Sequence, residues 1–592
     1  MCPLQKPLLK RLFSKNHPDW LFWGCLLLLN FLLFLPIYLF QAERASFWPV
    51  GNGTAVSVAD WLQTLFVQRS NPDIFRLHLE WLGLVTLWVL LRPLRRRRVL
   101  LLIFLVLVGQ LLYATYEGFI RSFYLLDPTF YNDYFLFWDM TGNVLRGLHL
   151  PLWVYAAGAV ALGGLLLALW RLLRFLLLGL PTERLSVWTR AGLCVLLLGA
   201  LGETAVFPTD TGQPETAVSS LVMKLLENSG RSRLAYARVN QFNSDNLAPH
   251  YQFTHNNLTQ KPDIYLLFVE SYGSVLYQRD DLLPATLRLH NELMDKLRDS
   301  GWNVASTRSE APTWGGASWV SYTSALTGLR LESHAQFLAL LDKYQERPFP
   351  HLINYLHDQG YRTYRLSSIG TELDETTLAA YQQFYRFDQW LQFSDLDYNG
   401  PLYGWGPSPP DQYALNAAET QMEAAGDEPH LLFFLTQNSH YPWNPLPTLA
   451  DDWRTLPDLP QPPVPPAERP SYDVLRQHYM TAVDYDLKTL VDFIVEQGDD
   501  NDLFILIGDH QPARVARYSD GWDTPVHIIS RNADLVDAFR PYADFSHSLS
   551  TRDITATLHH EGLYSLLMRV LLTQYGSDPT NVPDYAPGGF VD

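Results

Sequence analysis

The sequence has very little cysteine. Only Cys2, Cys25 and Cys194 occur among its 592 residues, so none lies beyond residue 194. The long polar part of the chain that follows therefore has no disulfide and no zinc site built from thiolates.

Basic residues are also scarce relative to acidic ones. The chain has 44 Lys and Arg against 61 Asp and Glu, which gives a net charge of −17. A protein that binds nucleic acid needs a broad basic face to neutralise phosphates. The charge balance therefore argues against nucleic acid as a partner.

Long apolar runs are confined to the first ~210 residues. Trp20–Phe40 carries no charge and is long enough to cross the hydrocarbon core of a bilayer. No small-residue cleavage site follows it, so we expect a retained anchor and not a signal peptide. The second run, at about 75–92, is the weakest candidate for a membrane span, because Arg76, His78 and Glu80 lie in its first turns. The predicted transmembrane region has five spans, at about 20–40, 75–92, 99–116, 150–170 and 187–207.

Charge orients these spans. Basic residues cluster before the first span, between the second and third, and between the fourth and fifth: Lys6, Lys10, Arg11 and Lys15; Arg92 and Arg95 to Arg98; Arg171, Arg174, Arg184 and Arg190. By the positive-inside rule these groups are cytoplasmic. We therefore predict a multi-pass protein of the inner (cytoplasmic) membrane, with everything after ~208 in the periplasm or outside the cell.

The C-terminal part alternates short apolar runs with helical patterns. The runs lie at 264–269, 303–306, 362–366, 431–435, 503–507 and 526–529, and the helical patterns at 282–299, 318–328, 347–359, 411–424 and 471–497. This alternation predicts an α/β domain with a largely parallel central sheet. The expected organisation is a transmembrane domain at 1–207, a connector at 208–261, the α/β domain at 262–574 and a surface tail at 575–592.

Side chains suited to metal binding follow three of the predicted strands. Glu270 comes directly after the first strand, His440 shortly after the strand at 431–435, and Asp509 and His510 directly after the strand at 503–507. Ligands of such sheets bind beyond the carboxyl ends of the strands. Carboxylates and imidazoles there can hold a divalent metal.

A hydroxyl-bearing loop, Thr313-Trp314-Gly315-Gly316-Ala317-Ser318, precedes one predicted helix. Taken alone, this pattern favours a Ser cap after a glycine turn. A helix N-terminus also suits a phosphate group, and a hydroxyl bound to a divalent metal becomes a nucleophile at neutral pH. The metal-binding residues at the same sheet edge make the nucleophile the stronger hypothesis, and the two interpretations are compatible.

Four stretches together resemble a known family: Glu270-Ser271 after an apolar strand, the Gly-rich hydroxyl loop, Asn438-Ser439-His440-Tyr441-Pro442, and Gly508-Asp509-His510. They are similar to the sulfatase-like branch of the alkaline phosphatase superfamily. The best match is the membrane-bound group that contains lipoteichoic acid synthase and the phosphoglycerol transferases of periplasmic glucans. The resemblance implies an alkaline phosphatase-like fold.

The resemblance also implies roles for individual residues. Glu270, Asp509 and His510 would bind one divalent metal (Mn²⁺, Mg²⁺ or Zn²⁺), and a hydroxyl that also contacts this metal would become transiently phosphorylated. Ser318 is the favoured nucleophile, with Thr313 as the runner-up. His440 would contact the substrate phosphate or the leaving group, and Trp314 is a further substrate-binding candidate. The donor would be a phospholipid, and the acceptor an extracytoplasmic glycan or lipid.

Two expected motifs of related enzymes are missing. The formylglycine signature of sulfatases, Cys or Ser followed by x-Pro-x-Arg, is absent around Ser318, which disfavours sulfate-ester hydrolysis by that route. The Arg-containing aromatic stretch that grips glycerol phosphate in lipoteichoic acid synthases has no clear counterpart at 367–390. A phosphodiesterase or phosphatase of the same superfamily therefore stays open as an alternative, and so does a non-catalytic envelope scaffold.

Overall fold

The computed structural model describes residues 18–40, 58–59, 62, 66–69, 75–91, 95–123, 127–137, 151–206, 215–239, 244–345, 347–370, 373, 375–462, 470–512, 514–516 and 520–590. The chain splits into two compact units, Met1–Arg233 and Leu234–Asp592. The domain boundaries drawn from the sequence stay predictions.

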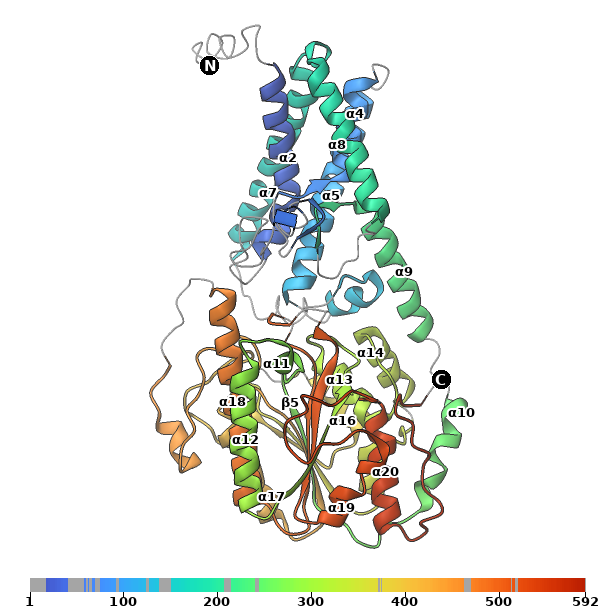
Figure 1. The fold of residues 1–592 in the computed structure, drawn as a ribbon, viewed down its shortest axis with the longest axis vertical. Coiled ribbons are helices and arrows are strands. Elements are labelled where there is room, and N and C mark those ends of the chain that lie inside the picture. Colours follow the sequence, from blue (N-terminus) through green and yellow to red (C-terminus); the bar gives the residue numbers. More distant parts are fainter. Residues whose placement is uncertain are drawn as a thin grey trace. The chain divides into compact units, whose positions relative to one another are not determined.

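The first unit is built from apolar helices (Figure 1): α2 (Pro18–Phe40), α4 (Leu79–Leu90), α5 (Arg97–Phe123), α7 (Leu152–Arg174) and α8 (Val187–Val206). Within the described residues, four stretches are helical, long enough and apolar enough to cross a membrane: Asp19–Phe40, Arg97–Ser122, Trp153–Gly179 and Val187–Val206. These helices fit a membrane protein with a soluble C-terminal domain.

The second of the five predicted spans is not confirmed. Its helix, α4, has 12 residues, which corresponds to about 18 Å against a hydrocarbon core of about 30 Å. The polar residues before and at its start explain the short length. The Nε of Arg76 donates to the carbonyl of Thr216, 2.7 Å away, and the backbone N–H of His78 donates to Asn30 at 3.0 Å. The chain is therefore extended, not helical, at Leu77–His78.

The predicted connector is largely helical where it is described. It contains α9 (Leu221–Val239), α10 (Ser244–Leu247) and a 3₁₀ segment, η5 (Ala248–His255). Glu80 accepts the backbone N–H groups of Leu221 and Val222 at 3.0 Å each. A carboxylate at a helix N-terminus satisfies unpaired donors and complements the helix dipole, so Glu80 fixes the start of α9.

The second unit contains a mixed sheet of eight strands in the order β12-β6-β11-β10-β5-β9-β7-β8. Their bounds are β5 Ile264–Val269, β6 Asn303–Glu310, β7 Arg362–Ser367, β8 Gln389–Gln392, β9 His430–Leu435, β10 Leu503–Gly508, β11 Asp523–Ser530 and β12 Leu558–His559. The strand β11 runs antiparallel to both of its neighbours, and the other pairings are parallel. The sequence predicted the strand at 526–529 but not its direction, because hydrophobicity does not encode the sense of a buried strand.

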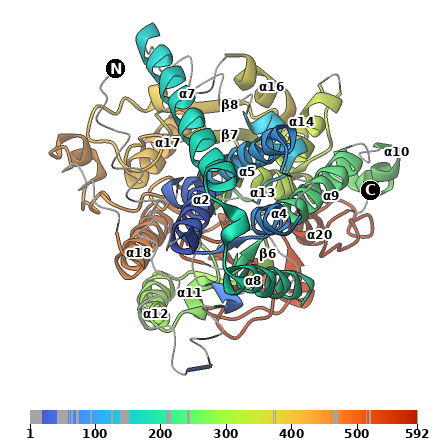
Figure 2. The ribbon, with the colours of Figure 1, turned by 90° about the horizontal axis from the view of Figure 1, so that it is seen from above.

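Helices cover both faces of this sheet (Figure 2). One face packs against α12 (Leu283–Asp299), α17 (Asp411–Ala425) and α18 (Tyr472–Gln497). The other packs against α13 (Ser318–Thr327), α14 (His334–Lys343), α15 (Leu352–Asp358), α16 (Glu375–Tyr385) and α20 (Gly562–Tyr575). Along β5, Leu266 faces the second group and Leu267 the first. Side chains alternate along a strand, so a strand buried on both faces is apolar throughout.

Three residues of the predicted surface tail at 575–592 are buried: Tyr575, Pro583 and Phe590. Phe590 is only 5% exposed and packs with the core of the second unit. Its ring lies 4.4 Å from that of His250 and 5.8 Å from that of Tyr564, centroid to centroid. A lone aromatic in a polar, Pro-containing segment carries no periodicity, so its burial could not be deduced from the pattern.

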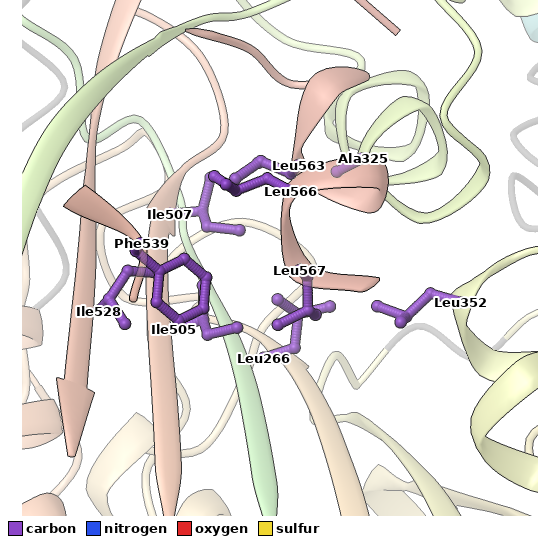
Figure 3. A pocket seen from close by; sticks show the side chains of 10 residues that line it. All are labelled: Leu266, Ala325, Leu352, Ile505, Ile507, Ile528, Phe539, Leu563, Leu566 and Leu567. Atoms are coloured by element: carbon purple, nitrogen blue, oxygen red, sulfur yellow. The ribbon is translucent and has the colours of Figure 1, made fainter. Parts of the chain in front are cut away.

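A small cavity lies between the sheet and α20 (Figure 3). Its volume is about 20 Å³ and its lining is apolar, with contributions from Leu266, Ala325, Leu352, Ile505, Ile507, Ile528, Phe539, Leu563, Leu566 and Leu567. About one water would fit a space of this size, but water needs polar partners. The cavity is therefore a packing defect of the core and not a ligand site.

We expect the substitution Leu566→Ala to lower the free energy of unfolding by about 2–5 kcal/mol, because it enlarges an existing void that the surrounding core cannot refill. Leu566 is 1% exposed. Denaturant unfolding of the detergent-solubilised chain measures the change. The control Leu373→Ala, at a residue that is 42% exposed, should change stability by less than about 0.5 kcal/mol. Equal effects of the two variants would contradict the cavity interpretation.

Two buried histidines share one tyrosine in the core beside β11. The hydroxyl of Tyr272 lies 3.0 Å from Nε2 of His290 and 3.1 Å from Nε2 of His527. Burial lowers the pKa of His290 to about 4 and that of His527 to about 3. Both rings are therefore neutral in the folded protein at neutral pH.

The stability of this domain should fall as the pH drops below about 6.5. In the unfolded chain the histidines take up protons near pH 6.5, whereas the folded core resists protonation down to about pH 3–4. Each depressed histidine then contributes a slope of up to about 1.4 kcal/mol per pH unit in this window. Unfolding free energies measured from pH 7 to pH 4 test this. The double variant His290→Gln/His527→Gln should reduce the slope but not remove it, because burial also lowers the pKa of His351 and of His560 to about 4. The control His547→Gln, at an exposed position, should leave the slope unchanged.

Candidate metal centre

Two neighbouring strands, β5 and β10, carry metal-binding side chains to one edge of the sheet. β5 ends at Val269 and is followed by Glu270, and its neighbour β10 ends at Gly508 and is followed by Asp509 and His510. The pairing is parallel, so both strands deliver these residues to the same edge. Within the described residues, they form one cluster whose candidate ligand atoms all lie within 4.8 Å of one another.

The distances inside this cluster suit one shared cation. Nε2 of His510 lies 3.5 Å from a carboxylate oxygen of Glu270 and 3.3 Å from Oδ2 of Asp509. Nδ1 of His510 lies 2.9 Å from the backbone carbonyl of Gln511. A carbonyl only accepts, so Nδ1 carries the proton and Nε2 turns its lone pair toward the carboxylates.

Local backbone geometry fixes Asp509. One carboxylate oxygen accepts the N–H groups of Ser271 and His510, each at 2.7 Å. The other, Oδ2, is buried and accepts no hydrogen bond from any described residue. A Cβ atom on Gly508 would lie 2.0 Å from the carbonyl oxygen of Tyr272, so only glycine permits the close approach of these two strand ends.

The electrostatics of the two carboxylates indicate that a cation fits between them. Burial opposes the charge on Glu270, but His510 and His440 favour it, and the pKa of Glu270 is lowered overall. Burial and the charge of Glu270 hold the pKa of Asp509 well above its usual range. Two buried carboxylates cannot both ionise at neutral pH without a positive partner. The bare Oδ2 of Asp509 and the lone pair of His510 point to a divalent metal as that partner.

Ser318 lies beside this cluster, at the first position of α13. Its Oγ donates a hydrogen bond of 2.9 Å to Glu270 and lies 3.3 Å from Nε2 of His510. The preceding residues Gly316 and Ala317 both have positive φ, at 76° and 61°. Ser271, beside Glu270, is also left-handed, with φ of 58°. Such a conformation costs a non-glycine residue about 1–2 kcal/mol, and strain of this kind concentrates at functional sites.

The other loop hydroxyl is placed differently. Thr313 is 4% exposed, and its Oγ1 makes no hydrogen bond within the described residues. Trp314 is 8% exposed and packs in the core, and its carbonyl accepts the N–H of Gln511 at 3.0 Å. The structure therefore brings Ser318, and not Thr313, to the carboxylates. The catalytic and substrate-binding roles of these residues stay predictions.

His440 lies in the loop after β9, next to a residue that the sequence did not single out. Its ring stacks on that of Trp405, with centroids 5.0 Å apart and an angle of 24° between the planes. Trp405 is 54% exposed, and it stands between Gly404 and Gly406, both with positive φ. The Gly-Trp-Gly pattern is visible in the sequence and could have identified Trp405. An exposed aromatic of this kind offers a ligand a surface for stacking or packing.

The same loop contributes two further residues that pattern reasoning did not assign. Thr436 accepts the backbone N–H of Glu270 at 3.0 Å, and Ser439 donates its hydroxyl to the carbonyl of Glu270 at 2.7 Å. Both residues follow the predicted strand at 431–435, but their spacing in the sequence does not indicate which backbone groups their hydroxyls contact. The backbone of the central carboxylate is thus held on both sides.

Comparison with known proteins gives one family match and several structural neighbours. Residues 271–532 match the family model described as Sulfatase. No curated protein matches the chain. Among solved structures, the chain is similar to a protein in the alkaline phosphatase superfamily from Vibrio parahaemolyticus, with 15% identity over 59% of this chain and 80% of that chain and a TM-score of 0.38.

Two other structures show the same kind of likeness. The lipoteichoic acid synthase LtaP from Listeria monocytogenes is 15% identical over 48% of this chain and 71% of that chain, with a TM-score of 0.32. The soluble domain of lipooligosaccharide phosphoethanolamine transferase A from Neisseria meningitidis is 11% identical over 58% of this chain and 98% of that chain, with a TM-score of 0.37.

The substitution Asp509→Asn should separate metal binding from stability. The amide oxygen can keep the N–H groups of Ser271 and His510, while its NH₂ group faces Glu270 and replaces repulsion by a hydrogen bond. We expect the melting temperature of the EDTA-treated chain to rise, and the further rise on adding Mn²⁺ or Zn²⁺ to disappear. Thermal unfolding with and without metal measures both effects. A wild-type chain that metal does not stabilise would contradict the metal centre.

Proposed function

We propose that this chain, whose residues 271–532 form a sulfatase-family domain of the alkaline phosphatase superfamily, is a metal-dependent phosphotransferase. It would move a phospholipid head group, of the phosphoglycerol or phosphoethanolamine type, to an extracytoplasmic glycan or lipid through a phosphorylated Ser318. The observation that carries the proposal is the position of the Ser318 hydroxyl, which donates to Glu270 and lies 3.3 Å from His510.

Glu270, Asp509 and His510 would hold the metal, which would be Mn²⁺, Mg²⁺ or Zn²⁺. A bound divalent cation supplies the positive charge that lowers the pKa of a neighbouring hydroxyl and stabilises charge on phosphoryl oxygens. The buried carboxylate pair and the bare Oδ2 of Asp509 support this assignment.

The first chemical step would be attack by Ser318 on the lipid phosphorus. The hydroxyl proton is already directed at Glu270. As the bond from Oγ to phosphorus forms, the bond from phosphorus to the diacylglycerol oxygen breaks, and that oxygen takes a proton. Ser318 is the first residue of α13, so the dipole of this helix and its unpaired N–H groups would favour the negative phosphoryl group.

His440 would serve the leaving group and then the acceptor. Its Nδ1 lies 2.6 Å from the carbonyl of Tyr441, so Nδ1 donates there and Nε2 is left for the substrate. In the second step, a hydroxyl of the acceptor attacks the phosphorus, the bond to Ser318 breaks, and the serine recovers its proton. His440 would deliver the proton to diacylglycerol and remove one from the acceptor. Trp314 stays a substrate-binding candidate, and Trp405 joins it through its stack on His440.

A lipid donor explains why such a domain is attached to apolar helices. The proposal includes five membrane crossings, in which α4 and the extended residues before it together form the second. Arg95 and Arg96, between α4 and α5, and Arg97 and Arg98, at the start of α5, would then be cytoplasmic, and the α/β domain would lie on the periplasmic or extracellular side of the inner membrane. A soluble hydrolase acting on water-soluble diesters would need no such anchor.

The substitution Ser318→Ala should abolish both turnover and covalent labelling. Purified full-length protein in vesicles of phosphatidylglycerol or phosphatidylethanolamine, each labelled in its head group, should release diacylglycerol in a metal-dependent way. Mass spectrometry should find the head-group phosphate on Ser318. Loss of a nucleophile of this kind costs on the order of 10⁴–10⁶ in kcat.

Thr313→Ala is the matched control and should retain labelling. If Thr313→Ala removes the covalent adduct and Ser318→Ala does not, the nucleophile assignment is wrong. If neither lipid is consumed while soluble phosphodiesters are cleaved, the protein is a hydrolase and the transferase proposal fails.

A further inference from the structure

The loop from Thr436 to His440, here called the His440 loop, connects two parts of the candidate site. It ends in His440, and it holds the backbone of Glu270 through Thr436 and Ser439. A shift of this loop would therefore move a predicted metal ligand and a predicted substrate contact together. The residues that hold the loop decide how accurately both are placed.

Asp411 binds this loop directly. It is the first residue of α17 and is fully buried. Its carboxylate accepts the N–H of Gln437 at 2.8 and 3.1 Å and the N–H of Asn438 at 2.7 Å. In return, the side-chain oxygen of Asn438 accepts the N–H of Asp411 at 2.7 Å. Backbone N–H groups only donate, so the loop requires an acceptor at this position.

A second carboxylate, Asp486, lies beside the first. It comes from α18 and is fully buried. The side chains of Asp411, Thr436 and Ser439 surround it, yet neither of its oxygens makes a well-formed hydrogen bond to a described residue. Burial raises the pKa of Asp486 to about 6. Burial and the charge of Asp486 raise the pKa of Asp411 well above its usual range.

Two adjacent buried carboxyl groups are stable when they share one proton, because a single negative charge is then spread over a hydrogen-bonded pair. The N–H groups of Gln437 and Asn438 occupy lone pairs of Asp411, and the shared proton lies between the two carboxyl groups. The hydroxyls of Thr436 and Ser439 and the backbone N–H of Ser439 lie beside the Asp486 carboxyl.

We infer that Asp411, packed beside Asp486, is a positioning residue of the active site: its hydrogen bonds to the N–H groups of Gln437 and Asn438 hold the His440 loop and, through that loop, the backbone of Glu270. This inference rests on the proposed metal centre. It extends the site to helices on the α12, α17 and α18 face of the sheet, remote from the nucleophile helix α13.

The test compares Asp411→Asn with Asp486→Asn in the detergent-solubilised full-length chain. Asp411→Asn presents an NH₂ group to backbone donors, so we expect the Mn²⁺ affinity to fall by about 10–100-fold, the usual range for loss of an outer-shell partner. Asp486→Asn keeps a donor to Asp411, so its affinity should stay within about threefold of wild type. Equilibrium dialysis against Mn²⁺ measures the affinity.

A second measurement does not depend on metal. Hydrogen–deuterium exchange of a peptide covering 436–440 should be faster in Asp411→Asn and unchanged in Asp486→Asn. Asp395→Asn is the control, because Asp395 accepts one backbone N–H, from Gln392, in an exposed cap. It should change neither the exchange of the loop nor the Mn²⁺ affinity.

The outcomes separate the inference from the function. Wild-type exchange and wild-type affinity in Asp411→Asn would overturn the inference, even if that variant melts at a lower temperature. Equal damage in Asp411→Asn and Asp486→Asn would overturn the proton-sharing arrangement. A wild-type chain that binds no Mn²⁺ would contradict the proposed function, while the exchange experiment would still decide whether Asp411 holds the loop.

Discussion

Two carboxylates are held side by side in a buried sheet edge, and their repulsion is the constraint on which the rest of the site depends. Glu270 is 2% exposed and Asp509 is fully buried, so water cannot screen their charges. The protein opposes this repulsion with the backbone N–H groups of Ser271 and His510 and with the hydroxyl of Ser318. These groups leave one oxygen of Asp509 bare. A divalent cation would complete the set, and in the proposed function the same cation would activate the serine beside it.

The sequence predicted the parts of this site that depend on strand position. Continuous apolar runs mark strands buried on both faces, and the residues after such runs lie at one edge when the strands are parallel. That reasoning placed Glu270, Asp509 and His510 together, and the structure brings their ligand atoms within 4.8 Å of one another. Ser318 was predicted because it lies between a glycine turn and an apolar helical pattern. Its nearness to Glu270 also depended on β6 and on the left-handed Ala317, which no pattern revealed.

The residues that could not be predicted from the sequence act through specific contacts and belong to no periodic hydrophobic pattern. Thr436, Ser439 and Asp411 hold backbone groups that are distant in the chain, and Trp405 matters because it stacks on one ring. The direction of β11 and the burial of Phe590 were missed for the same reason. The short helix α4 leaves the second predicted span unconfirmed: the run at 75–92 has a suitable composition, but Arg76 and His78 form polar contacts before the helix begins.

The large sequence separation between neighbouring strands has a consequence for how the chain folds. The carboxylate oxygen of Asp509 binds the N–H of Ser271 across 238 residues of sequence, and Thr436 binds Glu270 across 166. Contacts that close such large loops form late in folding. β5 can therefore pair with its two neighbours, β9 and β10, only after these distant segments of the chain have been made. A chain that has not yet been synthesised through Asp509 and His510 already contains five of the eight strands, β5 to β9, but lacks two of the three predicted metal ligands.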